Sequence, residues 1–395
     1  MPENKKKKIL WVVYDFYQAG GQRYVYEICK ALNKDKYQVD LLKVAEDGYD
    51  NSWEKEFYYQ PTLDMGCNIY SLGELLKNNT LKKKPFVSKL KRYVNRKIKG
   101  ISLGTNEDAG SHIVTISNFL EGYDFINFSG LNVYRTLCLG NDIEPVKGII
   151  HILTAQFQDD RSLFEGYTKT FNYHFVSSIA EKNLKEELVG INKYRFTDFP
   201  LSFETIPFEV NESTGDEKPL RIAIFTRLSA MKPLDPFFYA LKLLLEKGMK
   251  VELLVYGSGD PAALGIIRQL NYLYILDAVR FMGHTEDIPA TLKQAGIDLI
   301  WFQSNNQLPA GYAALEIAMS AIPQVFWDFM SNGIDETLAA IYPCFTRISD
   351  FTEYTEKLLL APEIRKQLGI KQRDFILEKH SVQNNIQLLE KLYDV

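Results

Sequence analysis

Short apolar segments alternate with longer amphipathic segments along the whole chain. The short segments are continuous runs of hydrophobic residues, which predict strands buried on both faces. The longer segments have apolar positions at helical spacing, as in Asp235–Glu246, and predict helices. This alternation is typical of parallel sheets covered by helices. The predicted strands are Lys8–Tyr14, Gln38–Val44, Asn68–Leu72, Asp124–Phe128, Lys147–Ile152 and His174–Ser177 in the first half, and Arg221–Phe225, Val251–Tyr256, Val279–Met282, Gly296–Phe302 and Gln324–Trp327 in the second.

The same pattern divides the chain into two α/β domains. A chain of 395 residues exceeds one typical core and suffices for two. The segment from 208 to 219 is polar and predicts a linker. We therefore expect a first domain over 1–208, a linker over 209–219, a second domain over 220–378 and an amphipathic C-terminal helix over 379–395.

Composition narrows the possible functions and location. Hydrophobic residues make up 46% of the chain, which suits a large core and not a disordered protein. The net charge of −4 offers no general attraction to nucleic acid, and none is expected as a partner. The four cysteines are far apart, as is typical of thiols in a reducing compartment. The first apolar run, Ile9–Tyr14, is too short for a signal peptide or a membrane span, so we expect a cytoplasmic protein.

Two cations follow the first predicted strand of the second domain. Arg227 and Lys232 lie between the strand Arg221–Phe225 and the helix Asp235–Glu246. Arginine offers a planar bidentate fork and lysine a compact charge, and a helix N-terminus adds backbone donors. This combination predicts a clamp for a diphosphate. The alternative is an ordinary solvated pair of basic residues.

Further signals follow in the same domain, in a fixed order. Glycine turns end the strands Val251–Tyr256 and Val279–Met282, and a glycine-started apolar segment follows a polar loop at 303–307. Together they resemble the retaining glycosyltransferases of family 4, also called glycosyl transferases group 1. These have the GT-B fold, in which two Rossmann-like doubly wound parallel-sheet domains face each other across a cleft. The family motifs G-R-L-x-x-x-K, G-x-G, F-x-G and E-x7-E, the last ending in L-E-A-M-A-x-G-x-P, are matched at Arg227, Leu228, Lys232, Gly257, Gly259, Phe281, Gly283, Gly311, Leu315, Glu316, Ala318, Met319 and Pro323.

The resemblance implies a role for each matched residue. Arg227 and Lys232 would hold the donor diphosphate and stabilise the leaving group, and Glu316 would bind the ribose hydroxyls. Neither a metal nor a cofactor is then required, and the expected donor is a UDP-sugar. The acceptor would be a glycan, a lipid-linked molecule or a protein. The other donor-binding residues would be Gly257, Gly259, Gly283, His284, Gln307 and Gly311.

The chain departs from the family pattern at several positions. Leu308 stands where the first glutamate of E-x7-E is expected, and the adjacent Gln307 would fill this site with an amide. An amide still binds hydroxyls but supplies no negative charge. Pro309-Ala310 replaces the usual glycine and phenylalanine, and Ala321 stands where the family has glycine. The departures are consistent with altered sugar specificity, a reduced rate, or a degenerate transferase that binds a partner.

Two further candidates lie in the first domain. Gly20 and Gly21 follow the strand Lys8–Tyr14, where their backbone would contact the donor phosphates, or they form only a tight turn. His151 ends the strand Lys147–Ile152. Enzymes of the resembled family often have a histidine there that faces the transferred sugar, which would make it catalytic. The alternative is a buried core histidine.

The segment 81–100 contains nine lysines and arginines and no acidic residue. Its apolar residues recur at helical spacing, which indicates a basic amphipathic helix. Such a helix is attracted to anionic headgroups, so we expect peripheral contact with the inner face of the membrane. The alternatives are a solvated surface helix or an arm for nucleic acid.

Two functional hypotheses follow. The first is an active retaining glycosyltransferase in polysaccharide, glycolipid or protein glycosylation. The second is a non-catalytic GT-B protein that acts as partner or chaperone of a true transferase. The oligomeric state is left open by the sequence.

Overall fold

The computed structural model describes residues 5–45, 56–79, 109–138, 143, 148–153, 173–179, 181, 184, 194–210, 218–230, 232–304, 308–309, 311–329 and 336–394. The chain divides into two compact units. The first consists of Met1–Phe203 and Val382–Val395, and the second of Glu204–Ser381. The division therefore lies between Phe203 and Glu204, whereas the sequence pattern predicts a linker at 209–219. The C-terminal helix belongs to the first unit.

The first unit is built on a parallel sheet. Its strands are β1 (Lys7–Val13), β2 (Tyr37–Lys43), β3 (Asn68–Ser71), β4 (Phe125–Phe128), β5 (Gly148–Ile152), β6 (Tyr173–Ser177) and β7 (Tyr194–Asp198), and its helices are α1 (Gly20–Ala31), α2 (Tyr59–Asp64), α3 (Leu72–Asn79), α5 (Ala109–Leu120), α6 (Leu131–Leu137) and α15 (Val382–Tyr393). The seven strands are ordered β3-β2-β1-β4-β5-β6-β7, and every neighbouring pair is parallel. The order reverses between β1 and β4, which makes this point the switch point of the sheet.

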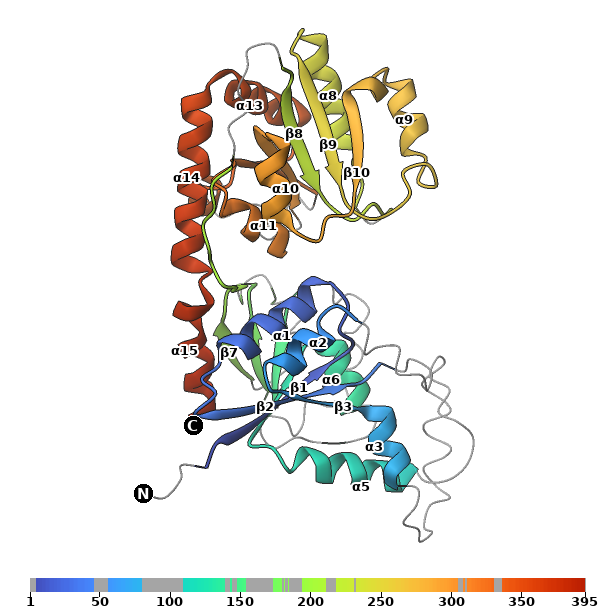
Figure 1. Ribbon diagram of the computed structural model, residues 1–395, viewed down its shortest axis with the longest axis vertical. Helices are drawn as coiled ribbons and strands as arrows, with labels where there is room; N and C mark the ends of the chain where they lie inside the picture. Colours follow the sequence, from blue (N-terminus) through green and yellow to red (C-terminus); the bar gives the residue numbers. More distant parts are fainter. Residues whose placement is uncertain are drawn as a thin grey trace. The chain divides into compact units, whose positions relative to one another are not determined.

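Alternate residues of the first sheet face different helices. Leu10 and Val12 of β1 pack with apolar residues of α5 and α6 in one cluster. Trp11, between them, points to the other face and contacts Tyr24 of α1 at a ring-centroid distance of 6.3 Å. Helix α15 packs beside α1 on this second face (Figure 1). Both faces are covered, which explains why the strand sequences are apolar throughout.

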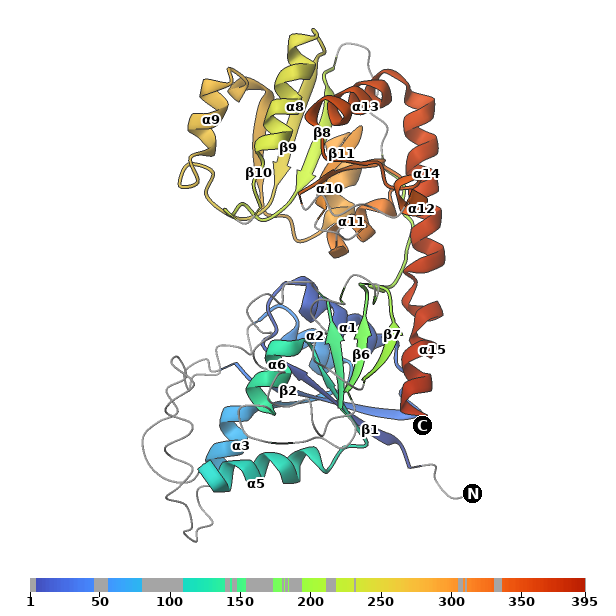
Figure 2. The same ribbon diagram turned by 180° about the vertical axis from the view of Figure 1, so that it is seen from behind.

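The second unit has the same construction. Its strands are β8 (Leu220–Phe225), β9 (Val251–Tyr256), β10 (Val279–Gly283), β11 (Leu299–Ser304), β12 (Gln324–Asp328) and β13 (Cys344–Phe345), and its helices are α8 (Asp235–Glu246), α9 (Ile266–Tyr272), the 3-10 helix η4 (Leu276–Ala278), α10 (Ile288–Ala295), α11 (Gly311–Ala318), α12 (Glu336–Ala339), α13 (Ile348–Leu360) and α14 (Pro362–Lys379). The six strands are ordered β10-β9-β8-β11-β12-β13, and all pairs are parallel. Helices α8 and α13 cover one face of this sheet, and α10 and α11 cover the other (Figures 1 and 2).

Local sequence signals fix the helix ends around this sheet. Asp287 caps α10 by accepting a hydrogen bond from the backbone N of Ala290 at 2.8 Å, and Pro289 occupies the first turn. The same helix ends at Gly296, whose φ of +58° favours glycine. Helix α8 begins with Asp235 and Pro236, which places a negative charge at its positive end.

Two strands were not predicted, for physical reasons. β7 is an edge strand whose residues are all partly exposed or exposed, so its sequence mixes charged with apolar residues. β13 has only two residues, too few to give a pattern. The segment 81–100, predicted to contact the membrane, lies outside the described residues. Among the residues that are described, no helix is both long enough and apolar enough to span a bilayer.

Candidate active site

The turn after β8 lies at the switch point of the second sheet. β8 pairs with β9 on one side and with β11 on the other, so the strand order reverses here. In open α/β sheets, ligands bind outside the carboxyl ends of the strands at such a point. Arg227 and Lys232 both lie in the connection between β8 and α8. The predicted clamp is therefore located where this type of sheet presents its strand ends to a ligand.

Arg227 and Lys232 have no acidic partner among the residues that the structure describes. Arg227 is exposed and Lys232 is half-buried. Across the described ranges, neither side chain forms a hydrogen bond or an ion pair. Burial, and then the charge of Arg227, lowers the pKa of the Lys232 amine. Both effects disfavour the charged lysine, and a bound anion would offset them.

The glycine turn after β9 packs directly on the backbone of the turn after β8. A Cβ atom on Gly257 would lie 1.7 Å from the carbonyl oxygen of Thr226, and one on Gly259 would lie 2.5 Å from that of Leu228. The backbone N of Leu228 donates to the carbonyl of Ser258 at 2.8 Å. Only glycine permits such close approach. The turn at Gly257–Gly259 thus packs against the turn that contains Arg227 (the cation turn) and restricts its backbone.

The end of β10 is hydrogen-bonded to the glycine turn after β9. The backbone N of Gly257 donates to the carbonyl of Gly283 at 2.8 Å. Gly283 has a φ of +79° and open space around its Cβ position, so its backbone conformation is what requires glycine. The exposed His284 follows it. Backbone hydrogen bonds therefore bring together the predicted donor residues on β8, β9 and β10.

The end of β11 supports the cation turn from the other side. The side-chain amide of Gln303 donates to the carbonyl of Pro233, which directly follows Lys232. Beyond β11, Gly311 begins α11 with a φ of +77°, and the half-buried Glu316 lies in this helix. Apart from Glu316, which lies within α11, the described donor residues predicted for the second unit thus follow the carboxyl ends of four neighbouring strands.

At one position of the resembled motif, an apolar residue replaces an acidic one. Leu308, where the first glutamate is expected, is half-buried and brings no polar group. Gln307, predicted to take over this site, lies outside the described residues.

A second departure from the motif affects only the backbone. Ala321 has a φ of +58°, in the left-handed region that favours glycine. This conformation explains why the resembled motif contains glycine at this position. Gly369 of α14 packs against the same turn, since a Cβ atom there would lie 1.7 Å from the carbonyl oxygen of Ala321.

The first unit places its glycine pair at the start of α1. Gly20 is exposed, and a Cβ atom on Gly21 would make an ordinary contact of 3.8 Å with Cδ1 of Leu153. The buried carboxylate of Asp15, just after β1, accepts a hydrogen bond from the side-chain amide of Gln22. Because the first backbone N–H groups of a helix lack helical partners, this turn offers donors to an anion.

His151 is fully buried, with a relative exposure of 0%. Its Nδ1 lies 2.9 Å from the hydroxyl of Tyr24, and its Nε2 lies 3.0 Å from Oδ1 of Asn127. Its ring centroid is 4.5 Å from that of Trp11. Burial, with a smaller contribution from His174, lowers the pKa of His151 to about 3. In this conformation both ring nitrogens are occupied inside the first unit, so the side chain has no surface to offer a sugar.

Sequence patterns did not reveal the residues that hold these sites. Gln303 lies at a strand end without a recognisable motif, and Tyr24, Asn127 and Tyr393 occupy core positions where apolar contacts are the usual expectation. Their polar pairing depends on strand and helix neighbours that only the fold defines. Within the described ranges, no group of three or more His, Cys, Asp or Glu side chains is arranged to hold a metal ion.

Comparison of the sequence with models of protein families finds no match, and no curated protein sequence matches either. Comparison with solved structures finds likeness over the whole chain. HepE of Anabaena, in complex with UDP and glucose, superposes with a TM-score of 0.66 at 13% identity, covering 98% of this chain and 100% of that chain. TarM superposes with a TM-score of 0.69 at 14% identity, covering 100% of both chains.

Sucrose-phosphate synthase from Thermosynechococcus elongatus superposes with a TM-score of 0.66 at 12% identity, covering 98% of each chain. At these identities the likeness shows the fold. The predicted fold class is thereby confirmed: the chain has two parallel-sheet α/β units of the GT-B glycosyltransferase fold.

Proposed function

We propose that the chain is a retaining glycosyltransferase of family 4 type, which moves a sugar from a UDP-sugar to a glycan, lipid-linked or protein acceptor. The observation that carries the proposal is the pair Arg227 and Lys232 at the switch point of the second sheet. Among the described residues this pair has no acidic partner, and burial lowers the pKa of Lys232. A bound diphosphate would supply negative charge to both cations. Structures of HepE with UDP-glucose and of S. aureus TarM with UDP support UDP as the nucleotide.

In the proposed reaction, the bond between the anomeric carbon and the phosphate oxygen breaks, and its electron pair leaves with UDP. Arg227 and Lys232 stabilise the charge that develops on the departing phosphate. The acceptor hydroxyl attacks from the same face, and its proton passes to the phosphate oxygen. The protein supplies positive charge and position, so we expect the reaction to proceed in the presence of EDTA. Loss of activity in EDTA that Mg²⁺ restores would contradict this part.

The other predicted residues bind the donor in this proposal. Glu316 accepts hydrogen bonds from the ribose hydroxyls, and His284 lines the nucleotide pocket. The turn at Gly20 and Gly21 offers backbone N–H groups to a donor phosphate. The glycines at 257, 259, 283 and 311 allow the backbone turns that follow the strands around the donor.

A second candidate function rests on Leu308. Leucine cannot bind a sugar hydroxyl or stabilise positive charge near the anomeric carbon. This favours a degenerate GT-B protein that binds a true transferase as partner or chaperone. The two cations, which have no acidic partner in the described part of the chain, argue for the active enzyme, since partner binding does not need a diphosphate clamp.

The experiment that separates the two measures binding by calorimetry and thermal shift against UDP, GDP, ADP and their sugars, with sugar release in the same samples. Arg227→Ala is compared with Arg268→Ala, whose guanidinium lies 5.8 Å from the ring centroid of Tyr272 on α9. We expect one nucleotide to stabilise the wild type, and Arg227→Ala to lower turnover by about 100-fold, as for loss of one oxyanion donor. Arg268→Ala should match the wild type.

The results distinguish the two functions. If Arg227→Ala retains full turnover, the role of the cation pair is refuted. If the wild type binds none of the nucleotides, the transferase is refuted and the partner-binding function gains support.

We also infer that residues 81–100 attach the protein to the inner face of the membrane. This inference rests on the sequence, in which nine cations occur without an acidic residue. The protein should sediment with vesicles containing phosphatidylglycerol and not with phosphatidylcholine alone. A variant with four of these lysines changed to glutamine should remain in the supernatant. Equal sedimentation of both proteins would refute the inference.

A further inference from the structure

Four buried polar side chains are joined by hydrogen bonds into a continuous series through the first unit, called here the buried chain. Tyr24 comes from α1, His151 from β5, Asn127 from β4 and Tyr393 from α15, and each has a relative exposure of 0%. The hydroxyl of Tyr24 lies 2.9 Å from Nδ1 of His151, whose Nε2 lies 3.0 Å from Oδ1 of Asn127. The hydroxyl of Tyr393 donates to the same oxygen at 3.0 Å. The chain thus connects the C-terminal helix to α1 across two strands.

The direction of each hydrogen bond follows from the amide oxygen. Because Oδ1 of Asn127 only accepts, Nε2 of His151 carries the proton and Nδ1 accepts from the hydroxyl of Tyr24. Burial lowers the pKa of His151 to about 3, so the imidazole stays neutral at physiological pH. The amide nitrogen of Asn127 is buried and has no partner among the described residues.

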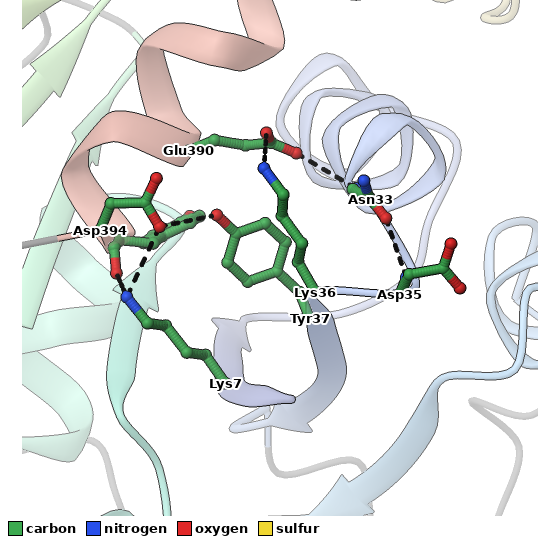
Figure 3. A network of polar contacts seen from close by, with 8 residues as sticks. Lys7, Asn33, Asp35, Lys36, Tyr37, Glu390 and Asp394 are labelled. Carbon is green, nitrogen blue, oxygen red and sulfur yellow. Dashed lines mark hydrogen bonds and ion pairs between the residues drawn. The ribbon is translucent and has the colours of Figure 1, made fainter. Parts of the chain in front are cut away.

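The outer end of the chain is anchored at the protein surface. Figure 3 shows polar contacts that hold the last turns of α15 against β1 and the connection between α1 and β2. The Lys7 amine donates to the carbonyl of Tyr393 at 2.6 Å and lies 3.5 Å from the Asp394 carboxylate. The Glu390 carboxylate accepts from the backbone N of Asn33 at 3.3 Å. These contacts fix the ring of Tyr393 at the end of the buried chain.

The inner end of the chain lies at the first turns of α1. Tyr24 follows Gly20 by four residues on this helix. The Cβ position of Gly21 lies 3.8 Å from Leu153, which follows His151 by two residues. The hydrogen bond between His151 and Tyr24 therefore links the end of β5 to the first turns of α1, and Leu153 lies close enough that a side chain on Gly21 would contact it.

We propose that Tyr393, Asn127 and His151 are positioning residues that act through Tyr24 to set the Gly20–Gly21 turn for the donor diphosphate. This inference rests on the proposed function. His151 then serves the donor from inside the first unit, without touching the sugar. In the polypeptide, α15 follows α14 of the second unit after the short connection at 380–381. The last helix is thus covalently linked to the unit with the cation pair while it helps to fix the glycine turn.

Tyr393→Phe tests this proposal, because it removes one hydroxyl and keeps the aromatic ring. Tyr37→Phe is the matched control. The two rings pack together with centroids 5.7 Å apart, but the hydroxyl of Tyr37 donates to Asp394 at 3.4 Å, outside the buried chain. We expect Tyr393→Phe to raise the Kd for UDP about three- to tenfold, as for one lost neutral hydrogen bond that orders a binding turn. Saturating turnover of UDP-glucose should change less than twofold, and Tyr37→Phe should match the wild type in both.

Tyr24→Phe provides a second test from the other end of the chain. It should raise the Kd for UDP by a similar factor, and the double variant Tyr24→Phe/Tyr393→Phe should be no weaker than either single variant. Multiplying effects in the double variant, or unchanged UDP binding in both folded single variants, would overturn the inference while leaving the proposed function intact. Absence of UDP, GDP and ADP binding by the wild type would overturn both.

Discussion

The buried His151 makes the stability of the first unit depend on pH. Its ring is fully buried, both of its nitrogens have hydrogen-bond partners, and burial lowers its pKa from an ordinary 6.5 to about 3. In the unfolded chain the same histidine takes up a proton near its ordinary pKa. Between these two pKa values the unfolded state binds more protons than the folded state, so acid favours unfolding.

The sign and size of the effect follow from these values. The contribution of neutral His151 to stability is fully present above pH 6.5 and is lost as the pH falls toward 3. Each pH unit in this window costs about 1.4 kcal/mol. Between pH 6.5 and 5.0 the first unit should therefore lose about 2 kcal/mol from this residue alone.

Hydrogen exchange read by mass spectrometry is the suitable assay, because peptides from β1, β4 and β5 report on the first unit alone. Exchange rates at pH 6.5 and pH 5.0, corrected for the intrinsic rate, give the free energy of opening in this unit. The wild type is compared with His151→Gln, and only the change with pH is evaluated. The variant should lose about 2 kcal/mol less than the wild type between the two pH values.

His174→Gln is the matched control. His174 lies on the neighbouring strand, bonds to the Thr197 hydroxyl at 2.9 Å and also has a pKa lowered by burial, but it is only half-buried. This variant should keep most of the acid loss. Parallel pH dependences of the wild type and His151→Gln would refute the buried, neutral state of His151.

Three further substitutions test a buried ion pair in the first unit and two backbone turns in the second. Lys43→Met leaves the buried carboxylate of Glu56 without the amine that lies 3.1 Å away, and should lower the free energy of unfolding by about 3–5 kcal/mol in urea; a loss below 1 kcal/mol would contradict the burial of this pair. Ala321→Gly relieves a left-handed backbone at φ +58° and should raise the thermal midpoint, with a stabilisation of about 1 kcal/mol; a lower midpoint would argue against this conformation. Gly257→Ala places a Cβ atom 1.7 Å from a backbone oxygen, and should abolish stabilisation by UDP in a protein that still folds; normal UDP stabilisation would show that the glycine turn does not support the cations.

Most strands of the fold were predictable from the sequence, because parallel strands buried on both faces are continuous apolar runs. The predicted strand Val251–Tyr256 has the bounds of β9. The edge strands carried less information, since β7 is partly exposed and β13 has two residues. The glycines that end β9 and β10 were also recognisable, because positive φ angles and close backbone contacts restrict these positions to glycine.

The surroundings of His151 could not be predicted in the same way. Its position in an apolar segment leaves open which face of the strand it occupies, and the resemblance suggested a sugar-facing role. The alternation along β5 places it on the face that α1 and α15 cover, with Tyr24 as its hydrogen-bond partner. Contacts such as that of Tyr393 with Asn127 join residues far apart in sequence, so only the fold brings them together.

Two of the departures from the resembled motif, Ala321 and Leu308, bear differently on the choice between transferase and partner protein. Ala321 adopts the backbone conformation for which the motif uses glycine, so this departure costs stability and leaves the chemistry unchanged. Leu308 removes one polar contact, but in the proposed reaction the charge that stabilises a departing diphosphate comes from Arg227 and Lys232. Burial, and then the charge of Arg227, lowers the pKa of the Lys232 amine, and a bound diphosphate would offset both effects. A protein that only binds a partner gains nothing from this arrangement, which is why the active enzyme with an altered sugar contact accounts better for the site.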